Sequence, residues 1–494
     1  MALVLRSASS PSFSPRNLLF LFLIILIALV IILYSISKRH FTITASPIEV
    51  SADNVVKIGD SDNKIKAASE MPVKKDLAFW SSDLHDGCRA DTASLLQYLN
   101  QTVILAGQKR RANPYAKLIF TLPNIIFAHE KRALASVIES HIAHSTSLSE
   151  ADIKSFHSYY ALDPLMASVD AFYCSFPASF CEAYMPFNKS IIWLPAHRFT
   201  LGRCSKKEFK RLITHLQLSA QDSPNRPKHF VAAGGRYDLE YIKYYTGLDA
   251  IFLPVNSLFY AYNVGKFTQS RAEILVGPLR VRDSPWFVHM RNASARAPSN
   301  IPKFVFSTAI LLYDFYSLEQ LSAHRVVVVL PYAVLSYGIT ELYTVGIPMF
   351  IPSIEFIVQL AIVRDRILPH KDICAQLKFE HLPPQHPKSN HPYSPDLSPD
   401  VDIEAFKYWI KFADYYQLPY IQTFDSWDDL IMKLANTNFQ LVHDQMMTEN
   451  EKRRSYLIAE WTKIIEKIEP NRIVPKDYQQ AIATLWGKKR LQAL

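Results

Sequence analysis

The loop between residues 82 and 88 contains side chains that could move a proton. His85 lies two residues after Asp83 and immediately before Asp86, and the loop follows an apolar segment of strand length, 76–81. An imidazole has an unperturbed pKa near neutrality, and a neighbouring carboxylate can orient its ring for general-base work. We therefore predict His85 as a catalytic base and Asp86 as its partner. The alternative is a histidine that caps the following helix or is simply solvated.

A second set of candidates follows later strand-like segments. His197 and Arg198 come directly after the apolar segment 190–194, and Glu182 lies near the start of a short helical pattern. His197 is a second candidate base, and the guanidinium groups of Arg198 and Arg271 suit bidentate phosphate binding. The alternatives are a structural contact for His197, an exposed helix position for Glu182 and a surface salt bridge for each arginine.

Residues 331–348 combine a strand end, a loop and a helix start. The valine-rich segment 326–330 stops at a proline, Gly338 lies in the loop, and Glu341 begins a helical pattern. A helix N-terminus that follows the carboxyl end of a parallel strand offers backbone N–H groups and a positive dipole end to a diphosphate. A carboxylate at such a place can accept hydrogen bonds from ribose or sugar hydroxyls. This segment is therefore suited to bind a diphosphate.

The segments around these candidates alternate between strand-like and helix-like patterns. Predicted strands are 76–81, 102–106, 118–127, 167–175, 190–194, 229–233, 250–253, 274–276, 303–307, 326–330 and 348–351. Predicted helices are 89–100, 131–143, 178–184, 206–218, 237–246, 317–323, 341–345, 404–416, 426–435 and 449–468. Such alternation favours α/β domains with mostly parallel sheets that helices cover on both faces.

Two consecutive halves of this kind, 75–262 and 263–430, are each expected to be a Rossmann-like, doubly wound domain. The second carries a Pro-rich surface insertion at 369–400, and closing helices occupy 431–494. The arrangement resembles the GT-B glycosyltransferase superfamily, most clearly over 326–352. The segment 237–254 is also similar to the last helix and strand of a GT-B N-terminal domain. Many retaining members carry two glutamates eight positions apart; here the earlier position is Ala333.

The resemblance implies a nucleotide-sugar donor, a glycan, protein or lipid acceptor, and a cleft between the domains. It assigns no further cofactor and no metal. It places the acceptor in the first domain and the donor in the second, and some inverting members have a catalytic histidine in the first loop. The implied site residues are His85, Asp86 and His197 for catalysis, Ser336, Tyr337, Gly338, Thr340, Glu341 and Arg271 for the donor, and Asp83, Gly87, Glu182 and Arg198 for the acceptor. The alternative is a catalytically inactive GT-B-like protein that binds or scaffolds in the Golgi.

The N-terminus contains one long apolar run. Residues 18–34 are unbroken and extend to 37, about the 20 residues that a helix needs to cross a bilayer. We predict a cytoplasmic tail at 1–17, an uncleaved anchor at 18–37 and a polar stem at 38–74. Basic residues flank the run on both sides, so they do not orient it. A type II Golgi protein with a lumenal body is expected, with the endoplasmic reticulum as the alternative.

Composition narrows the remaining possibilities. The net charge is +9, but the basic residues are scattered, and no nucleic-acid partner is expected. The five cysteines match no zinc spacing and permit up to two disulfides in an oxidising lumen. Sequons at Asn100, Asn188 and Asn292 are candidate glycosylation sites. Neither a Gly-x-Gly-x-x-Gly nor a Walker pattern is present, which argues against a dehydrogenase or an NTPase.

Overall fold

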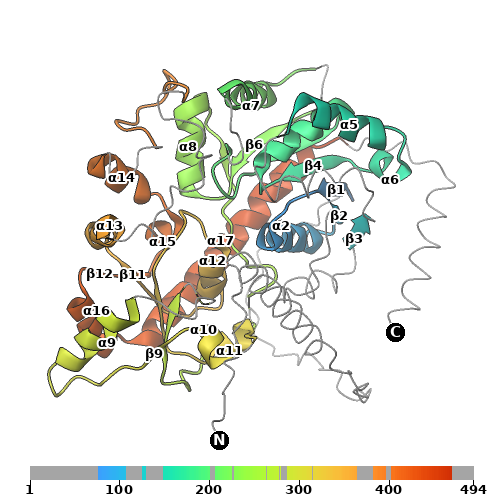
Figure 1. Ribbon diagram of the computed structural model, residues 1–494. Helices are drawn as coiled ribbons and strands as arrows, with labels where there is room; N and C mark the ends of the chain where they lie inside the picture. Colours follow the sequence, from blue (N-terminus) through green and yellow to red (C-terminus); the bar gives the residue numbers. More distant parts are fainter. Residues whose placement is uncertain are drawn as a thin grey trace, which may run out of the picture. The chain divides into compact units, whose positions relative to one another are not determined.

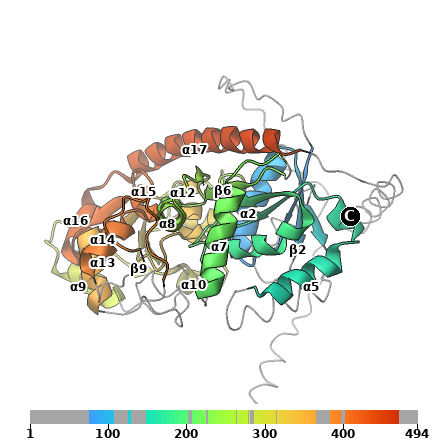
Figure 2. The same ribbon diagram turned by 90° about the horizontal axis from the view of Figure 1, so that it is seen from above.

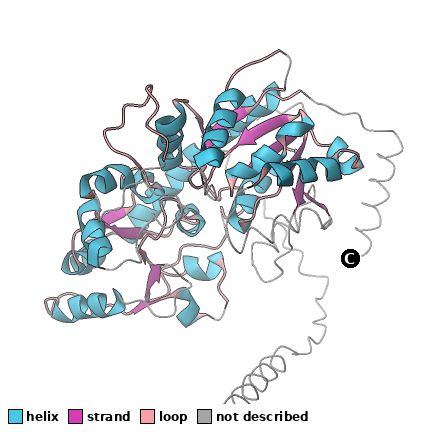
Figure 3. Ribbon diagram, turned by 45° about the horizontal axis from the view of Figure 1, so that its top comes forward, coloured by secondary structure: helices cyan, strands magenta, loops and turns pink. Residues whose placement is uncertain are grey.

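The computed structural model divides the chain into two units, 1–70 and 71–494, and every described residue belongs to the second. The described residues are 76–106, 125–128, 148–200, 206–224, 227–262, 264–277, 279, 286–313, 315–363, 382–395 and 402–469. Figure 1 follows the chain through these elements, and Figure 3 shows their strands in two groups. The side chains of 125–128 and 361–363 lie outside the description.

The first sheet has seven parallel strands in the order β3-β2-β1-β4-β5-β6-β7. Their bounds are β1 Ala78–Ser81, β2 Thr102–Ala106, β3 Ile125–Ala128, β4 Ala171–Cys174, β5 Ser190–Trp193, β6 Phe230–Ala233 and β7 Ile251–Phe252. β1, β4, β5 and β6 are buried along their whole length, as expected of strands covered on both faces. The order of the first six is that of a Rossmann fold, so the chain changes direction between β1 and β4.

Helices surround this sheet. They are α2 Asp86–Tyr98, α5 Glu150–Tyr160, α6 Pro164–Ala167, the 3-10 turns η1 Ala178–Ala183 and η2 Met185–Phe187, α7 Lys206–Ser219 and α8 Arg236–Thr246. α7 buries one stripe, with Phe209, Leu212 and Leu216 inside, as its apolar spacing predicts. α8 stops at Gly247, whose φ of +69° is a left-handed conformation that glycine adopts at little cost.

The second sheet has five parallel strands in the order β12-β11-β10-β8-β9. They are β8 Ile274–Gly277, β9 Phe306–Ser307, β10 Val327–Val329, β11 Met349–Pro352 and β12 Gln422–Phe424. Its helices are α9 Trp286–Arg296, α10 Ala309–Leu312, α11 Leu318–Ser322, α12 Tyr337–Thr344, α13 Ile354–Val363, α14 Ile403–Ile410, α15 Asp414–Gln417 and α16 Trp427–Asn436. This strand order is the flavodoxin-like one, and its change of direction lies between β8 and β10.

One long helix joins the two halves. α17, Phe439–Lys467, packs Met446 into the core that contains the second sheet, and the Asn450 amide donates to the Tyr343 carbonyl at 3.1 Å. Towards its carboxyl end, Trp461 and Ile465 pack in the cluster formed by α2 and the first sheet. Figure 2 shows α17 running past elements of both halves. Its position therefore fixes both halves to one rigid element.

The predicted strands and helices are confirmed at most positions that the structure describes. Two helices begin earlier than expected: α12 starts at Tyr337 rather than Glu341, and α17 starts at Phe439 rather than 449. Among the described elements, five helices and one strand were not predicted from the sequence: α5, α6, α9, α10, α13 and β12. The predicted helix 131–143 and the anchor at 18–37 lie outside the described residues. Within the described part, no helix has the length and apolar character that a membrane crossing needs.

The described part of the Pro-rich insertion, 382–395, contacts both halves. His386 donates its backbone N–H to the carbonyl of Tyr244 on α8 at 2.8 Å. The indole of Trp409 on α14 donates to the Tyr393 carbonyl at 2.9 Å. The insertion was expected to be a surface loop. Its described residues instead pack against α8 and α14, and Ser389 is buried.

Buried aspartates lie where the halves meet. Asp414, at the start of α15, donates its N–H to the Val334 carbonyl at 3.0 Å. Its carboxylate and that of Asp238 on α8 both face Gly235, where an added Cβ would lie 3.0 Å from Asp414 Oδ1 and 3.4 Å from Asp238 Oδ2. Burial raises the pKa of Asp414 to about 8, and burial raises the pKa of Asp91 on α2 to about 7. These groups favour the protonated form in the folded protein.

This burial gives the free energy of unfolding a defined pH dependence. An aspartate titrates near 3.9 when unfolded, so between about pH 4 and 8 the folded protein binds more protons at Asp414 than the unfolded chain does. The contribution of Asp414 to stability is then fully present below this window and is lost as the pH rises through it, by up to about 1.4 kcal/mol per pH unit.

We predict that Asp414→Asn makes the melting temperature less dependent on pH between 5 and 8 than in the wild type. Asp428→Asn is the matched control, because Asp428 on α16 is 65% exposed and pairs with Arg296 on the surface. Differential scanning calorimetry at several pH values measures both. Parallel curves for wild type and Asp414→Asn would show that this carboxyl does not titrate on unfolding.

Candidate functional site

A cleft with an empty volume of about 1310 Å³, partly open to solvent, lies where the carboxyl ends of both sheets meet. The loop after β1 and the start of α2 form one side; the ends of β8 and β10, α11 and α12 form the other. Its lining residues are Leu84, His85, Asp86, Gly87, Gly277, Leu279, Tyr316, Leu318, Leu321, Val329, Tyr332, Ser336, Tyr337, Gly338, Ile339, Glu341 and Leu342. Each sheet contributes the strand end at its change of direction, where ligands of α/β proteins bind.

The N-terminus of α12 points into this cleft. Ser336 is its N-cap residue, and its carbonyl accepts from the N–H groups of Ile339 at 3.0 Å and Thr340 at 3.1 Å. The first two N–H groups of the helix, on Tyr337 and Gly338, lie before the first of these hydrogen bonds and are not donors in them. An added Cβ on Gly338 would meet only Ser336 Oγ, at 3.8 Å, so a ligand can approach this backbone closely. No described residue accepts from these two N–H groups, and together with the positive dipole end they favour an anion here.

The N-terminus of α2 lies against the same helix tip. His85 is its N-cap and stacks on the ring of Tyr337, with ring centroids 5.2 Å apart. A Cβ on Gly87 would lie 2.7 Å from Tyr337 Cγ, so only glycine allows this approach without movement. The predicted contact residue Gly87 therefore brings the two helix tips together. Two positive dipole ends line one cleft.

His85 occupies the position that the helix-capping alternative predicts. Its Nδ1 accepts a hydrogen bond from the Gly87 N–H at 3.1 Å. In a neutral imidazole this bond leaves the proton on Nε2, so the ring presents a donor to the cleft. A general-base role for His85 stays a prediction and requires the Nδ1 bond to be released. The side chain is exposed and lines the cleft, as a catalytic group must.

The two predicted aspartates of this loop have different positions. Asp86 lines the cleft and pairs with Arg89, at 3.7 Å between Asp86 Oδ1 and Arg89 Nη1. Asp83 is 2% exposed, and its Oδ1 accepts from the N–H groups of Ser175 at 2.7 Å and Phe176 at 3.0 Å. Burial raises the pKa of Asp83 to about 6, although these bonds favour the charged form. Asp83 thus joins the loops after β1 and β4 beside the cleft and is not among its lining residues.

Glu341 lines the cleft from the second turn of α12, because the helix begins four residues earlier than predicted. It is 4% exposed, and its Oε1 accepts from the Tyr260 hydroxyl at 2.6 Å. Thr340 is buried and donates to the Tyr337 carbonyl at 2.9 Å, so its hydroxyl is used inside the protein. Among the predicted donor residues, Ser336, Tyr337, Gly338 and Glu341 are the ones that line the cleft.

The structure places the other predicted residues away from the cleft lining. Arg271 precedes β8 at its amino end, opposite the cleft, and pairs with Glu273 at 3.0 Å. His197 is 8% exposed, and its Nδ1 accepts from the Arg198 N–H at 2.9 Å. Arg198 is 1% exposed and donates to the Tyr237 hydroxyl at 2.8 Å. These side chains have structural partners.

Glu182 is also a structural residue here. Its side chain is fully buried and accepts from Arg211 at 3.1 Å and contacts His215 Nδ1 at 2.9 Å, both on α7. These contacts connect η1 to α7, and the acceptor contact predicted for Glu182 stays a prediction. The sequence could not distinguish the two roles, because Arg211 lies 29 residues further along the chain.

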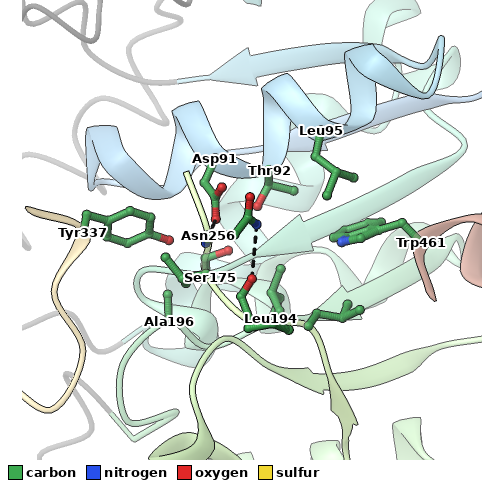
Figure 4. Close-up of a pocket in the computed structure, with 12 residues that line it drawn as sticks. Asp91, Thr92, Leu95, Ser175, Leu194, Ala196, Asn256, Tyr337 and Trp461 are labelled. Carbon is green, nitrogen blue, oxygen red and sulfur yellow. Dashed lines mark hydrogen bonds between the residues drawn. The ribbon is translucent and has the colours of Figure 1, made fainter. Parts of the chain in front are cut away.

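A smaller cavity, with an empty volume of about 280 Å³, lies beside the first, and Tyr337 lines both. Figure 4 shows Asp91, Ser175 and Asn256 around it, with Trp461 of α17 at one end. Ser175 Oγ is buried and makes no hydrogen bond within the described residues. None of these four residues was predicted from the sequence as part of a site. The available indication was Asp91, because it is a charged residue on a helix, α2, whose neighbouring residues are buried.

The predicted modification sites are accessible. Asn100, Asn188 and Asn292 are all exposed, at the end of α2, after η2 and on α9 respectively. Cys174 and Cys181 form a disulfide, and Cys88 is a buried free thiol. Cys204 and Cys374 lie outside the described residues. Within those residues, no group of three or more His, Cys, Asp or Glu side chains is arranged to hold a metal ion.

Comparison with known proteins finds similarity only among solved structures; no family model and no curated protein matches the chain. The chain is similar to the glycotransferase of kitacinnamycin, at 12% identity over 81% of this chain and 100% of that one, with a TM-score of 0.40. It is also similar to the spinosyn forosaminyltransferase SpnP, at 8% identity, 79% and 99% coverage and a TM-score of 0.37. A third similar structure is the spinosyn rhamnosyltransferase SpnG complexed with thymidine diphosphate. Its sequence identity is 10% over 78% of this chain and 99% of that one, and the TM-score is 0.33. The structure itself has two parallel α/β halves, as the alternating pattern of the sequence predicts.

We predict that Glu182→Gln lowers the free energy of unfolding by about 3 kcal/mol, because it leaves Arg211 without its buried carboxylate. Chemical denaturation measures the change. Glu404→Gln is the control: its side chain is 66% exposed, lies 3.3 Å from Lys407, and should change stability by less than about 1 kcal/mol. Equal effects would mean that Glu182 does not connect η1 to α7. If Glu182→Gln instead reduced the affinity for the acceptor without loss of stability, the result would support the predicted role of Glu182 in acceptor binding.

Proposed function

We propose that this protein is a glycosyltransferase that transfers a sugar from a nucleotide-sugar donor to an acceptor hydroxyl. The observation that carries the proposal is the cleft with two helix N-termini and the switch points of two parallel sheets around it. A nucleotide sugar matches this environment, since its diphosphate needs N–H donors and positive dipole ends. The acceptor is a glycan, protein or lipid.

The diphosphate is assigned to the tip of α12. In the transfer, the acceptor oxygen forms a bond to the anomeric carbon, the bond from that carbon to the diphosphate breaks, and the acceptor proton goes to a base. Negative charge develops on the leaving diphosphate, where the Tyr337 and Gly338 N–H groups can stabilise it. The described lining residues include neither lysine nor arginine, so backbone donors and helix dipoles supply this stabilisation within the described part of the site.

His85 and Glu341 have the other proposed roles. His85 is the proposed base, because it is the one imidazole among the described residues lining the cleft. Glu341 is proposed to accept hydrogen bonds from donor hydroxyls at the cleft wall. Asp86 lines the cleft beside His85 and is kept as the candidate that orients it.

The proposed context is a type II Golgi membrane protein with a lumenal body. The apolar run at 18–37 supports an anchor. The Cys174–Cys181 disulfide supports an oxidising compartment, and the three exposed sequons are compatible with the same one. The donor is the proposed partner in the cleft, and the membrane is a partner through the anchor alone.

A second candidate function is a GT-B-like protein that binds a nucleotide sugar without turnover. The capping bond between Gly87 N–H and His85 Nδ1 favours it, because that bond occupies the nitrogen that a base partner would otherwise orient. In this case the protein would bind the donor in the same site but would not transfer its sugar.

The test uses the full chain in detergent with UDP-, GDP- and dTDP-sugars. For a sugar nucleotide at 100 times its dissociation constant, we expect about 2.7 kcal/mol of added stability in a thermal-shift assay, together with hydrolysis or transfer. Glu341→Ala should weaken binding, whereas His85→Ala should bind normally and lose about 10²–10⁴-fold in rate. Binding without turnover in the wild type would select the second candidate. No binding to any donor would reject both.

Gly338→Ala gives an independent test of the phosphate site. Alanine fits the space at this position and favours a helix over glycine by about 1 kcal/mol, so the variant should be as stable as the wild type or more stable. Its methyl group would occupy the approach to the first N–H groups, and we expect the affinity for a nucleoside diphosphate to fall at least about tenfold. Calorimetric titration with UDP, GDP and dTDP measures this. An unchanged affinity would place the diphosphate elsewhere.

A further inference from the structure

The residue that holds Glu341 does not come from the second half of the protein. Tyr260 belongs to the segment 253–262 that follows β7, the last strand of the first sheet; we call this segment the linker. Its hydroxyl lies 2.6 Å from Glu341 Oε1 and 3.0 Å from Ser257 Oγ. Tyr260 is 7% exposed, so water contributes little at this contact. A cleft carboxylate is therefore bound by the chain that connects the two halves.

The hydroxyl protons can be assigned by counting. A phenol has one proton, and the shorter contact to a carboxylate is the stronger, so Tyr260 donates to Glu341. Thr340 donates its proton to the Tyr337 carbonyl. The Ser257 proton then goes to Tyr260 or to Thr340 Oγ1, which is 3.2 Å away. Each hydroxyl has a partner, and Tyr260 is the phenolic donor to Glu341 in the described structure.

The linker is fixed in the conformation that makes this contact. Ser257 is fully buried and has a φ of +57°, a left-handed conformation that is unfavourable for a residue with a Cβ. Asp91 of α2 holds it: Asp91 Oδ1 accepts from the Ser257 N–H at 2.9 Å, and Oδ2 accepts from the Asn256 N–H at 3.3 Å. The strain is thus offset by two bonds from the first half.

These contacts form a continuous path between the two cleft helices. It runs from Asp91 on α2, through Ser257 and Tyr260 in the linker, to Glu341 on α12. Both helices present their N-termini to the cleft. The carboxylate orientation on one side of the cleft therefore depends on the linker that sets the relation between the halves.

We propose that Tyr260 is a positioning residue that orients the Glu341 carboxylate for the hydroxyls of the donor. This inference rests on the proposed nucleotide-sugar site. Tyr260 touches no substrate; it fixes one oxygen of Glu341 so that the carboxylate presents a defined face to the cleft. The linker thereby takes part in donor recognition, and a change in its conformation changes donor affinity.

The test compares Tyr260→Phe with Tyr262→Phe in the full chain. Tyr262 lies two residues further along the linker, and its hydroxyl donates to Glu451 on α17 near the surface, away from Glu341. Both variants lose one phenolic oxygen. Affinity and KM are measured with UDP-, GDP- and dTDP-glucose, and Glu341→Ala and the double variant Tyr260→Phe/Glu341→Ala complete a double-mutant cycle.

We expect Tyr260→Phe to raise KM for the donor about tenfold with kcat changed less than about threefold, and Tyr262→Phe to match the wild type. In the Glu341→Ala background, the Tyr260 substitution should have no further effect on KM, because its role passes through that carboxylate. A purely structural role would instead reduce the melting temperature and give the same loss in both backgrounds, which overturns the proposal. Unchanged donor KM in Tyr260→Phe also overturns it. A wild-type chain that binds none of the donors rejects the proposed function and this inference with it.

Discussion

The contact between the tips of α2 and α12 is the constraint on which the site depends. Tyr337 can lie over Gly87 because that position has no Cβ, and His85 then stacks on the same ring. A larger residue at position 87 would push the helix tips apart by its contact with Tyr337 Cγ. Through this contact the carboxyl ends of two independent parallel sheets face one cleft, and two helix dipoles act on it together.

The two halves also share buried polar groups, which makes their relation specific. The Tyr260 hydroxyl in the linker donates to Glu341 on α12, and the Asp414 carboxylate of the second half faces Gly235 of the first. Burying a carboxylate costs free energy unless hydrogen bonds offset it. These positions therefore favour the one arrangement of the halves that keeps their partners in place, whereas purely apolar contacts would tolerate several arrangements. α17 adds apolar contacts to both halves along a single rigid helix.

The described lining of the proposed site contains few charged side chains. Its lining has the carboxylates of Asp86 and Glu341, the imidazole of His85 and mostly apolar neighbours. A carboxylate beside an anion site is unfavourable unless a hydrogen-bond donor fixes it, and Tyr260 does so for Glu341. The position of Glu341 in the second turn of α12 separates its charge from the helix tip that is the proposed anion site.

The sequence by itself determined the elements, because period and burial are local properties of a segment. The apolar segments at 102–106, 190–194 and 326–330 are buried strands, and the spacing at 206–218 is an amphipathic helix, as expected. The helices at 286–296 and 354–363 were not predicted. In the first, the helical spacing of apolar residues is weak. In the second, nearly all residues are apolar, so no helical spacing is visible. The starts of α12 and α17 were placed four and ten residues too late, at Glu341 and 449 instead of Tyr337 and Phe439.

Only the tertiary structure decided what each polar side chain does, since the partner is usually far away in the chain. Glu182 meets Arg211 from 29 positions away, Asp83 accepts from a backbone 92 positions away, and Tyr260 reaches Glu341 across 81. A carboxylate in a sequence has the same chemistry whether it faces a cleft or a buried arginine. The sequence thus determined which strand ends and helix starts could form a site, and packing selected the side chains that reach it.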